Sequence, residues 1–421
     1  MNRDSLGILC NTFSGGTPST EHPEYWNGNI PWLSSAESAK DFIYDSDTYI
    51  TQEGVDNSAT KLAKKNSVLI ATAGQGKTRG QVSHLENDAY INQSLISITP
   101  KDDKILNDLY LYYYLKNSYQ RLRNLSDVTG VRGSLSGDLL KTFLIEYPDI
   151  KTQNKIVDVL RTIDKKIENN NKISTELESL AKTIYDYWFL QFEFPNEEGK
   201  PYKSSGGKMV FNEEMNREIP EGWEIKRLAE IEDNIITGKT PSTKDPENYS
   251  GNIPFITIGD IRGNVYVVNT EQNLSEKGAN SQSNKYIPGG SLCVTCIATP
   301  GLISFASQKS QTNQQINSII FSKEYNKPFL YFAIKQSFET TAGAKTGNTF
   351  ANMNKEDFSN IKILYFQKTA KQFYDKVSDF FREMSVKSKE NQKLSSLRDW
   401  LLPMLMNGQV TFKEQDENFS S

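Results

Sequence analysis

The sequence predicts an α+β fold in which two repeated globular α/β domains are separated by two long helices that pair with each other. Apolar residues recur three and four positions apart between Lys151 and Trp188, which is the pattern of a long coiled-coil helix. The same pattern returns 217 residues later, near the C-terminus. Short phrases of the first half also return in order in the second half, so the chain is an internal duplication.

Both long helices carry an apolar seam that turns polar in its middle. The polar positions are Asn170 and Ser174 in the central helix, with Lys387 and Asn391 as their counterparts. A polar layer of this kind usually fixes the register of a helix pair at some cost in stability. We expect that role here, and a gap for a partner protein is the alternative. The apolar seam consists of Ile156, Leu160, Ile163, Ile167, Leu177 and Ile184 in the central helix, and of Phe373, Val377, Phe380, Met384, Leu394 and Leu401 in the C-terminal helix.

Three further landmarks occur once in each repeat. Between them the offset drifts slowly from 223 to 219, as small loop insertions in one of two equivalent domains would produce. The aromatic run has helical spacing, which predicts core packing rather than a platform on which bases stack. The landmarks are residues 14–20 and 237–243, which share a Thr-Pro-Ser-Thr phrase; residues 92–93 and 313–314, an Asn-Gln pair; and the aromatic runs 110–116 and 329–335.

Composition and charge limit the classes of function. The chain has 421 residues, of which 37% are hydrophobic, enough for two or more folded domains. No apolar run approaches the roughly 20 residues that cross a bilayer, and the N-terminus lacks a secretory signal, so we expect a cytoplasmic protein without membrane contact. The formal net charge of −4 argues against coating nucleic acid by bulk positive charge, so any such role needs local basic patches.

No catalytic or metal-binding motif is complete. Cys293 and Cys296 form a lone C-x-x-C pair in an apolar run, where buried strand cysteines are expected rather than a zinc or redox site. Residues 71–78 resemble a nucleotide-binding P-loop, but Ala71 replaces the first glycine and no helix-like segment follows. We therefore expect a non-catalytic chain with no metal or cofactor of its own. A nucleotide hydrolase built on this loop is an alternative that an ATPase assay tests.

Two glycine-rich loops of the first domain are rich in hydrogen-bond donors. Arginine and lysine can make bidentate hydrogen bonds to guanine edges in the major groove of DNA, and glutamine can do so with adenine. A solvated loop without a ligand is the alternative. The candidate residues are Gln75, Lys77, Thr78, Arg79 and Gln81 in the first loop, and Arg132 in the second.

These residues resemble a known family, the specificity (S) subunits of type I restriction-modification systems. The resemblance rests on Gly-Gly-Thr-Pro-Ser-Thr, Pro-Glu-Tyr-Trp and Gly-Asn-Ile-Pro-Trp in the first repeat and on their echoes in the second. It also rests on Gln153-Asn-Lys-Ile156 before the central helix and on the linker from Gly199 to Trp223. It covers essentially the whole chain.

The resemblance implies that each globular domain is a target recognition domain that reads one half of a bipartite sequence in double-stranded DNA. It implies that the two helices pair antiparallel as a spacer. It also implies two modification subunits that carry S-adenosylmethionine and methylate adenines, and two restriction subunits, using ATP and Mg, that can join them. Residues 298–306 stand at the place of the first donor-rich loop and are uncharged, so the second domain is expected to use DNA shape and hydroxyl contacts such as Ser304.

Domain boundaries follow from the landmarks. The first repeat lacks a counterpart of Ile219–Glu224, so its first strand is expected to be shortened or supplied by the C-terminal tail, in which residues 410–412 could form a strand. Residues 205–207 are expected to turn a hairpin. A DNA-independent coiled-coil scaffold is the main alternative function. The expected segments are target recognition domains at 1–149 and 219–367, spacer helices at 150–193 and 368–408, a linker at 194–218 and a tail at 409–421.

Overall fold

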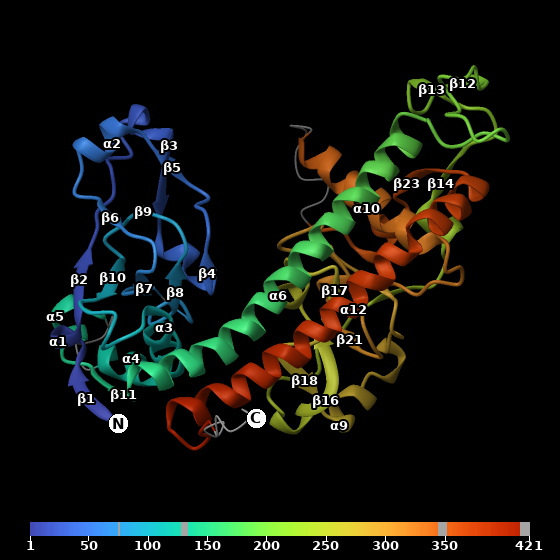
Figure 1. The fold of residues 1–421 in the computed structure, drawn as a ribbon. Helices are drawn as coiled ribbons and strands as arrows, with labels where there is room; N and C mark the ends of the chain where they lie inside the picture. Colours follow the sequence, from blue (N-terminus) through green and yellow to red (C-terminus); the bar gives the residue numbers. More distant parts are fainter. Residues whose placement is uncertain (75, 128–133, 344–351, 413–421) are drawn as a thin grey trace, which may run out of the picture. The chain divides into compact units, whose positions relative to one another are not determined.

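The structure is a computed structural model that describes residues 1–74, 76–127, 134–343 and 352–412, and it divides into two compact units (Figure 1). Unit 1 comprises residues 1–165 and 396–421, and unit 2 comprises residues 166–395. Each unit therefore combines one globular domain with parts of both long helices. No helix in the described ranges is long and apolar enough to span a membrane.

Unit 1 contains two main sheets, ordered β2-β10-β7-β8-β4 and β5-β3-β9-β6, and a two-stranded ladder β1-β11. All neighbours in the larger sheet are antiparallel except β4 and β8, which are parallel. The elements are β1 Asn2–Ser5, α1 Leu6–Leu9, β2 Cys10–Ser14, β3 Trp26–Leu33, β4 Phe42–Ile43, β5 Tyr49–Ile50, α2 Gln52–Asp56, β6 Lys61–Ala63, β7 Val68–Ala71, β8 Val82–Leu85, β9 Ala89–Ile91, β10 Leu95–Pro100, α3 Asp108–Asn117, α4 Tyr119–Asp127, α5 Gly137–Lys141, β11 Leu144–Tyr147 and the start of α6 Ile150–Tyr185.

Unit 2 repeats this plan. Its five-stranded sheet has the order β15-β22-β19-β20-β17, and its ladder β14-β23 matches β1-β11. The linker folds as the hairpin β12-β13. The elements are β12 Met209–Asn212, β13 Arg217–Pro220, β14 Glu224–Arg227, α7 Leu228–Ile231, β15 Ile235–Thr237, β16 Tyr249–Ile256, α8 Ile258–Ile261, β17 Tyr266–Val267, β18 Gln272–Leu274, α9 Glu276–Asn280, β19 Leu292–Thr295, β20 Ile303–Ala306, β21 Gln311–Thr312, β22 Ile316–Ile319, α10 Asn326–Gly343, α11 Lys355–Ser359, β23 Lys362–Tyr365 and most of α12 Gln367–Met406.

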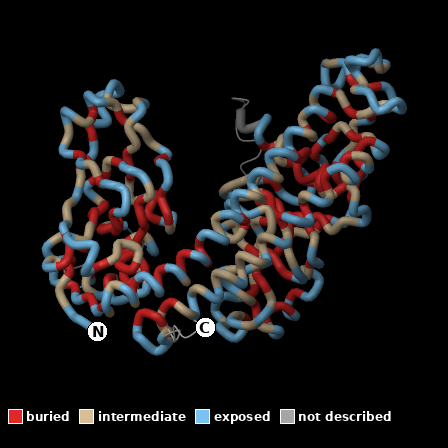
Figure 2. The backbone as a smooth tube through the Cα atoms, viewed as in Figure 1, coloured by how far each residue is buried: buried red, intermediate tan, exposed pale blue. Residues whose placement is uncertain are grey.

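The aromatic runs form core helices in both units, as the sequence predicts. Asn107 caps α3 by accepting a hydrogen bond from the backbone N–H of Tyr110. Tyr110 and Tyr113 are fully buried, and Phe329 and Phe332 are buried at the matching positions of α10. Figure 2 shows the buried stretches of each unit alternating with exposed ones along the chain. These rings fill the cores and are not available for stacking on bases.

The two long helices lie side by side and run antiparallel. Within unit 2, Tyr185 of α6 packs against Phe373 of α12, with ring centroids 6.1 Å apart. Further along, the side chain of Asn170 donates to Asn391 at 2.8 Å. Residue numbers thus fall along α6 as they rise along α12. The predicted polar layer places Asn170 against Asn391, which in turn donates to Asn171 at 2.7 Å.

No residue of the predicted apolar seam is exposed. The polar layer adds Glu390, which accepts a hydrogen bond from Asn170 at 3.0 Å. Two aromatic residues outside the seam, Tyr185 and Phe381, are buried against the globular part of unit 2. Each helix therefore has a second buried face. The seam residues Ile156, Leu160, Ile163, Phe373, Val377 and Met384 are buried, and Ile167, Leu177, Ile184, Phe380, Leu394 and Leu401 are partly buried.

Three local expectations need correction. The first strand of unit 1 is β1 itself, which pairs with β11, so the tail does not supply it. Residues 410–412 form no strand, and Phe412 instead packs at the edge of the unit 1 core. Residues 205–207 turn the chain before β12, whereas the hairpin turn lies at residues 213–216. Glycines marked a turn correctly there, but they did not identify which turn joins the strands.

Candidate nucleic-acid interface

In unit 1 the donor-rich loop joins the two central strands β7 and β8 and comprises ten residues, 72–81. The N–H of Gly80 donates to the carbonyl of Ala71 at 2.8 Å, which closes the base of the loop. Gly74 and Gly76 have φ values of +127° and +70°, in the region that favours glycine. Glycine therefore allows the tight path of this loop.

Helix α4 holds the loop from one side. The hydroxyl of Tyr119 donates to the carbonyl of Lys77 at 2.8 Å, and the guanidinium of Arg123 donates to the carbonyl of Gly76 at 2.5 Å. Arg79 forms an ion pair with Asp127 at the end of α4. Sequence reasoning missed this support, and its one signal is the spacing of Arg123 and Asp127, four residues apart on one helix face.

The structure separates the predicted DNA-binding residues of unit 1 by exposure. Lys77 is exposed, and Thr78 and Gln81 are partly buried. Arg79 is only 8% exposed and bonded to Asp127, so the expectation that it reaches a base edge needs correction: its guanidinium holds the loop in place. Gln75 and Arg132 lie outside the described residues.

The counterpart in unit 2 joins β19 to β20 and is three residues shorter, at residues 296–302. It is uncharged. The N–H of Gly301 donates to the carbonyl of Thr295 at 2.9 Å, and the hydroxyl of Thr295 donates to the carbonyl of Thr299 at 2.5 Å. The two units thus present loops of different length and charge at the same place in the fold.

Ser304 is not part of the loop in unit 2. It lies within strand β20, is fully buried, and its hydroxyl donates to the carbonyl of Asn264. The expectation of a DNA contact is therefore wrong for Ser304. Ser304 is the second residue of β20, as Ser83 is of β8, and Ser83 is also fully buried.

The repeated Thr-Pro-Ser and Asn-Gln phrases meet in space in both units. The hydroxyl of Thr17 donates to Gln93 at 2.5 Å, and that of Thr240 donates to Gln314 at 2.5 Å. A Cβ at Gly15 would lie 1.8 Å from the carbonyl oxygen of Ile91, so only glycine fits there. These phrases hold neighbouring segments together, which explains why both repeats carry them.

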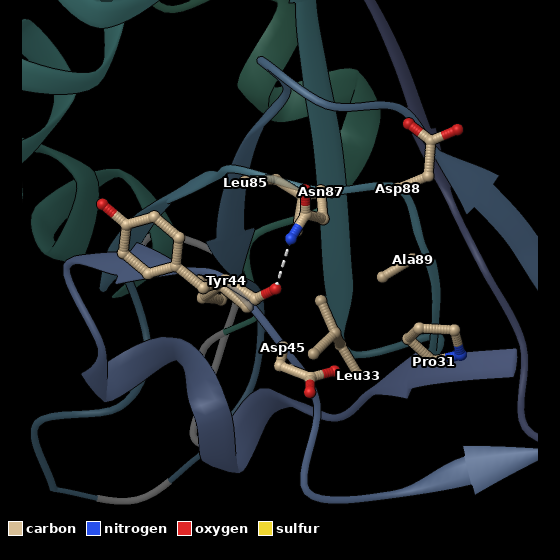
Figure 3. Close-up of a pocket in the computed structure, with 9 residues that line it drawn as sticks. Pro31, Leu33, Tyr44, Asp45, Leu85, Asn87, Asp88 and Ala89 are labelled. Carbon is tan, nitrogen blue, oxygen red and sulfur yellow. Dashed lines mark hydrogen bonds between the residues drawn. The ribbon is translucent and has the colours of Figure 1, made fainter. Parts of the chain in front are cut away.

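A small cavity in unit 1, of about 210 Å³, lies between β3, β4 and the β8–β9 connection (Figure 3). Its carboxylates already have partners: Asp88 pairs with Lys64 at 2.9 Å, and Asp45 accepts from Tyr49 at 2.5 Å. The side chain of Asn87 donates to the carbonyl of Tyr44 across the cavity. The cavity is smaller than most ligand pockets, and both of these carboxylates are already bonded within the protein.

The P-loop alternative is not supported by the local fold. A phosphate-binding loop leads into a helix whose N-terminus meets the phosphates. Here strand β8 follows residues 71–78 instead. In the described ranges no three His, Cys, Asp or Glu side chains group as metal ligands would.

Comparisons with known proteins agree on one family. A family model described as "Type I restriction modification DNA specificity domain" matches residues 4–179 and 220–396. The chain is 32% identical over 405 residues to the type I restriction enzyme HindI specificity subunit of Haemophilus influenzae, covering 84% of this chain and 88% of the relative. It is 28% identical over 416 residues to the MjaIX specificity subunit of Methanocaldococcus jannaschii, covering 95% and 91%. Its fold is similar to the S subunit of M. genitalium, with a TM-score of 0.56 at 16% identity, covering 96% and 95% of the two chains.

Proposed function

Because the chain belongs to the family of type I restriction-modification specificity subunits, we propose that it recognises a bipartite sequence in double-stranded DNA, one half with each globular domain. It is the non-catalytic member of its complex, and partner subunits carry the chemistry. One observation carries the proposal of two half-sites: residues 72–81 and 296–302 occupy the same place in the two units and differ in length and charge.

The first domain contributes a charged contact. Lys77 is exposed on a loop whose backbone is held by hydrogen bonds from Tyr119 and Arg123. The backbone that carries its ammonium group is therefore fixed in place. The uncharged loop of unit 2 is suited to reading shape and methyl groups rather than to bidentate hydrogen bonds. The Lys77→Gln variant should weaken binding to the cognate site about tenfold or less in a gel-shift assay with the modification subunits present. Equal binding of wild type to cognate and scrambled duplexes would count against sequence recognition.

The partners we propose are two modification subunits. Equivalent positions of the two long helices, Leu180 and Leu397, are 49% and 44% exposed, and Trp400 beside the second is 57% exposed. Exposed apolar side chains repeated at equivalent positions suit two copies of one partner. S-adenosylmethionine would be bound by these subunits, and ATP and Mg by two restriction subunits that join the cytoplasmic complex.

The mass of the co-purified complex tests the partner proposal. Leu180→Glu and Leu397→Glu should each release one modification subunit, and the double variant should release both. The exposed pair Lys182→Glu and Lys389→Glu serves as the control for added negative charge on the same helices. Full assembly of the double leucine variant would contradict docking at these positions.

We propose that α6 and α12 act as the spacer between half-sites, with the polar layer at Asn170 and Asn391 fixing their register. Inserting one heptad at matched positions of both helices should change the number of bases between half-sites and leave the half-sites themselves unchanged. Sequencing of methylated DNA from cells carrying the variant measures this. A DNA-independent scaffold, the rival function, would instead assemble partners with no methylated motif.

A further inference from the structure

Unit 2 contains a pocket at a place that large side chains occupy in the described part of unit 1. Its volume is about 720 Å³, within the range of ligand-binding pockets. It lies between the end of α6, the β12–β13 hairpin, α10 and strand β23. Its lining includes Phe189, Met215, Arg217, Ala333 and Thr340.

The pocket arises where small residues of unit 2 replace large residues of unit 1. Arg121 of unit 1 lies over the ring of Phe143, with its guanidinium carbon 4.7 Å from the ring centroid, and donates to the hydroxyl of Tyr114 at 3.2 Å. By the repeat offsets of 219 and 218, these three residues correspond to smaller ones in unit 2. Unit 2 therefore has an open space where unit 1 is filled. The replacements are Thr340 for Arg121, Ala333 for Tyr114 and Ile361 for Phe143.

Arg217, which lines this pocket, has no anionic partner among the residues that the structure describes. Arg217 of β13 is partly buried over the ring of Phe192, and its Nε is buried without a hydrogen-bond partner. No ion pair joins it to another described residue. Asp357 also lines the pocket, but it forms no ion pair with Arg217 in the described part of the chain. A desolvated guanidinium without an anion is costly, and a bound carboxylate would offset that cost.

The hairpin that borders the pocket also exposes apolar side chains. Met215 at the pocket is exposed, and Phe211 and Val210 of β12 are 62% and 37% exposed. Large apolar side chains exposed on one short hairpin mark a surface for a protein partner more than for a small molecule. The second unit thus combines exposed apolar side chains, a pocket and an arginine that forms no ion pair with any described residue.

We propose that this pocket docks a peptide segment of a partner protein, in which a carboxylate stands next to an aromatic or aliphatic side chain. The apolar side chain enters the space between Ala333 and Ile361, and the carboxylate meets Arg217 as a bidentate ion pair. Because large side chains fill the equivalent place in the described part of unit 1, one such segment binds per chain. The interaction is independent of DNA recognition, so it is tested without DNA.

Titration of the full-length chain with short peptides tests the proposal. The probes are acetyl-Glu-Trp-Leu-amide and its neutral counterpart acetyl-Gln-Trp-Leu-amide, followed by calorimetry. We expect one acidic peptide per chain, and at least fivefold weaker binding of the neutral peptide. Arg217→Gln should make the two peptides bind equally weakly. Arg262→Gln, an exposed arginine of unit 2 outside the pocket lining, should change nothing.

A second variant blocks the pocket without touching the charge. Ala333→Tyr restores the residue of unit 1 and should abolish binding of both peptides, while circular dichroism verifies folding. If either probe binds twice per chain, or if Arg217→Gln leaves the preference for the acidic peptide intact, the proposal fails. Tighter binding of indole-3-acetate than of the acidic peptide would identify a small-molecule site and overturn docking of a peptide segment.

Discussion

The two units form the same contact between a sheet strand and a core helix with different kinds of side chain. In unit 1 His84 of β8 is buried and hydrogen-bonded to Asp108 at 2.8 Å and to Glu86 at 3.2 Å. In unit 2 the equivalent position is Phe305, stacked on Tyr331 with centroids 5.6 Å apart. One backbone plan thus accepts a polar network or an aromatic cluster, provided that each is satisfied internally.

The same contrast extends to the helices that cover the domains. Asp164 of α6 accepts from Tyr113 at 2.6 Å and pairs with Arg398 of α12 at 2.8 Å. At the offset of 217, unit 2 has Phe381 in place of Asp164, and Ala181 corresponds to Arg398. Phe381 meets Tyr331 edge to face at 5.6 Å. The difference indicates that fold and helix packing are shared between the repeats, whereas the side chains that provide them are not.

The largest expected effect on stability comes from placing histidine, the residue of unit 1, at the equivalent position in the aromatic cluster of unit 2. Phe305→His places an imidazole among aromatic rings, and the counterparts of Glu86 and Asp108 in unit 2 are Ser307 and Lys327. We expect a loss of about 3–5 kcal/mol of unfolding free energy, because ring contacts are lost and a polar group is buried unpaired. Hydrogen exchange of unit 2 peptides measures it, and unit 1 peptides are the internal control. A loss below about 1 kcal/mol would show that the two chemistries are interchangeable.

A smaller effect is expected from the ion pair that supports the loop of unit 1. Arg79→Ala removes an ion pair between a nearly buried arginine and the exposed carboxylate of Asp127. It should lower the unfolding free energy of unit 1 by about 1–3 kcal/mol and increase exchange in residues 72–81. The exposed neighbour Lys77→Ala should cost less than about 0.5 kcal/mol. If both variants exchange alike, Arg79 does not hold the loop.

Replacing Arg121 of unit 1 by threonine, its counterpart in unit 2, should lower the unfolding free energy by a smaller amount. Arg121→Thr removes the cation–π contact with Phe143 and the hydrogen bond to Tyr114, worth about 1 kcal/mol together in a partly exposed setting. It should also open a cavity in unit 1 that a crystal structure of the variant would reveal. Thr340→Ala in unit 2 is the matched control and should leave stability unchanged.

The smallest expected effect is a dependence of stability on pH in unit 1 alone. Burial lowers the pKa of His84, but its hydrogen bonds to Asp108 and Glu86 outweigh burial, so the pKa lies above its usual value. Its stabilisation is therefore complete below the unfolded pKa of about 6.5 and is lost as pH rises through the folded pKa. Hydrogen exchange of β8 across this range should show the loss, and His84→Phe should remove it. A slope of opposite sign would mean that His84 is held neutral.

The sequence predicts the duplication, the long helices with their polar layer, and the buried aromatic runs, because these depend on periodicity and spacing. It does not predict which donors are exposed. Arginine is a residue type that contacts base edges, but the guanidinium of Arg79 pairs with Asp127, which is distant in sequence. Ser304 is misplaced because a loop three residues shorter moves it into a strand. The pocket beside Arg217 depends on three side-chain volumes at once, which only the fold brings together.

Exchange of one globular domain tests the central claim most directly. Residues 1–149 would be replaced by the corresponding region of the Haemophilus influenzae relative, in a host that carries the cognate modification subunits, and methylated adenines would be mapped by sequencing. If each domain reads one half-site, the methylated motif stays bipartite, one half-site changes, and the other half-site and the spacer stay as in the wild type. A change in both half-sites, or a single contiguous motif, would contradict one half-site per domain.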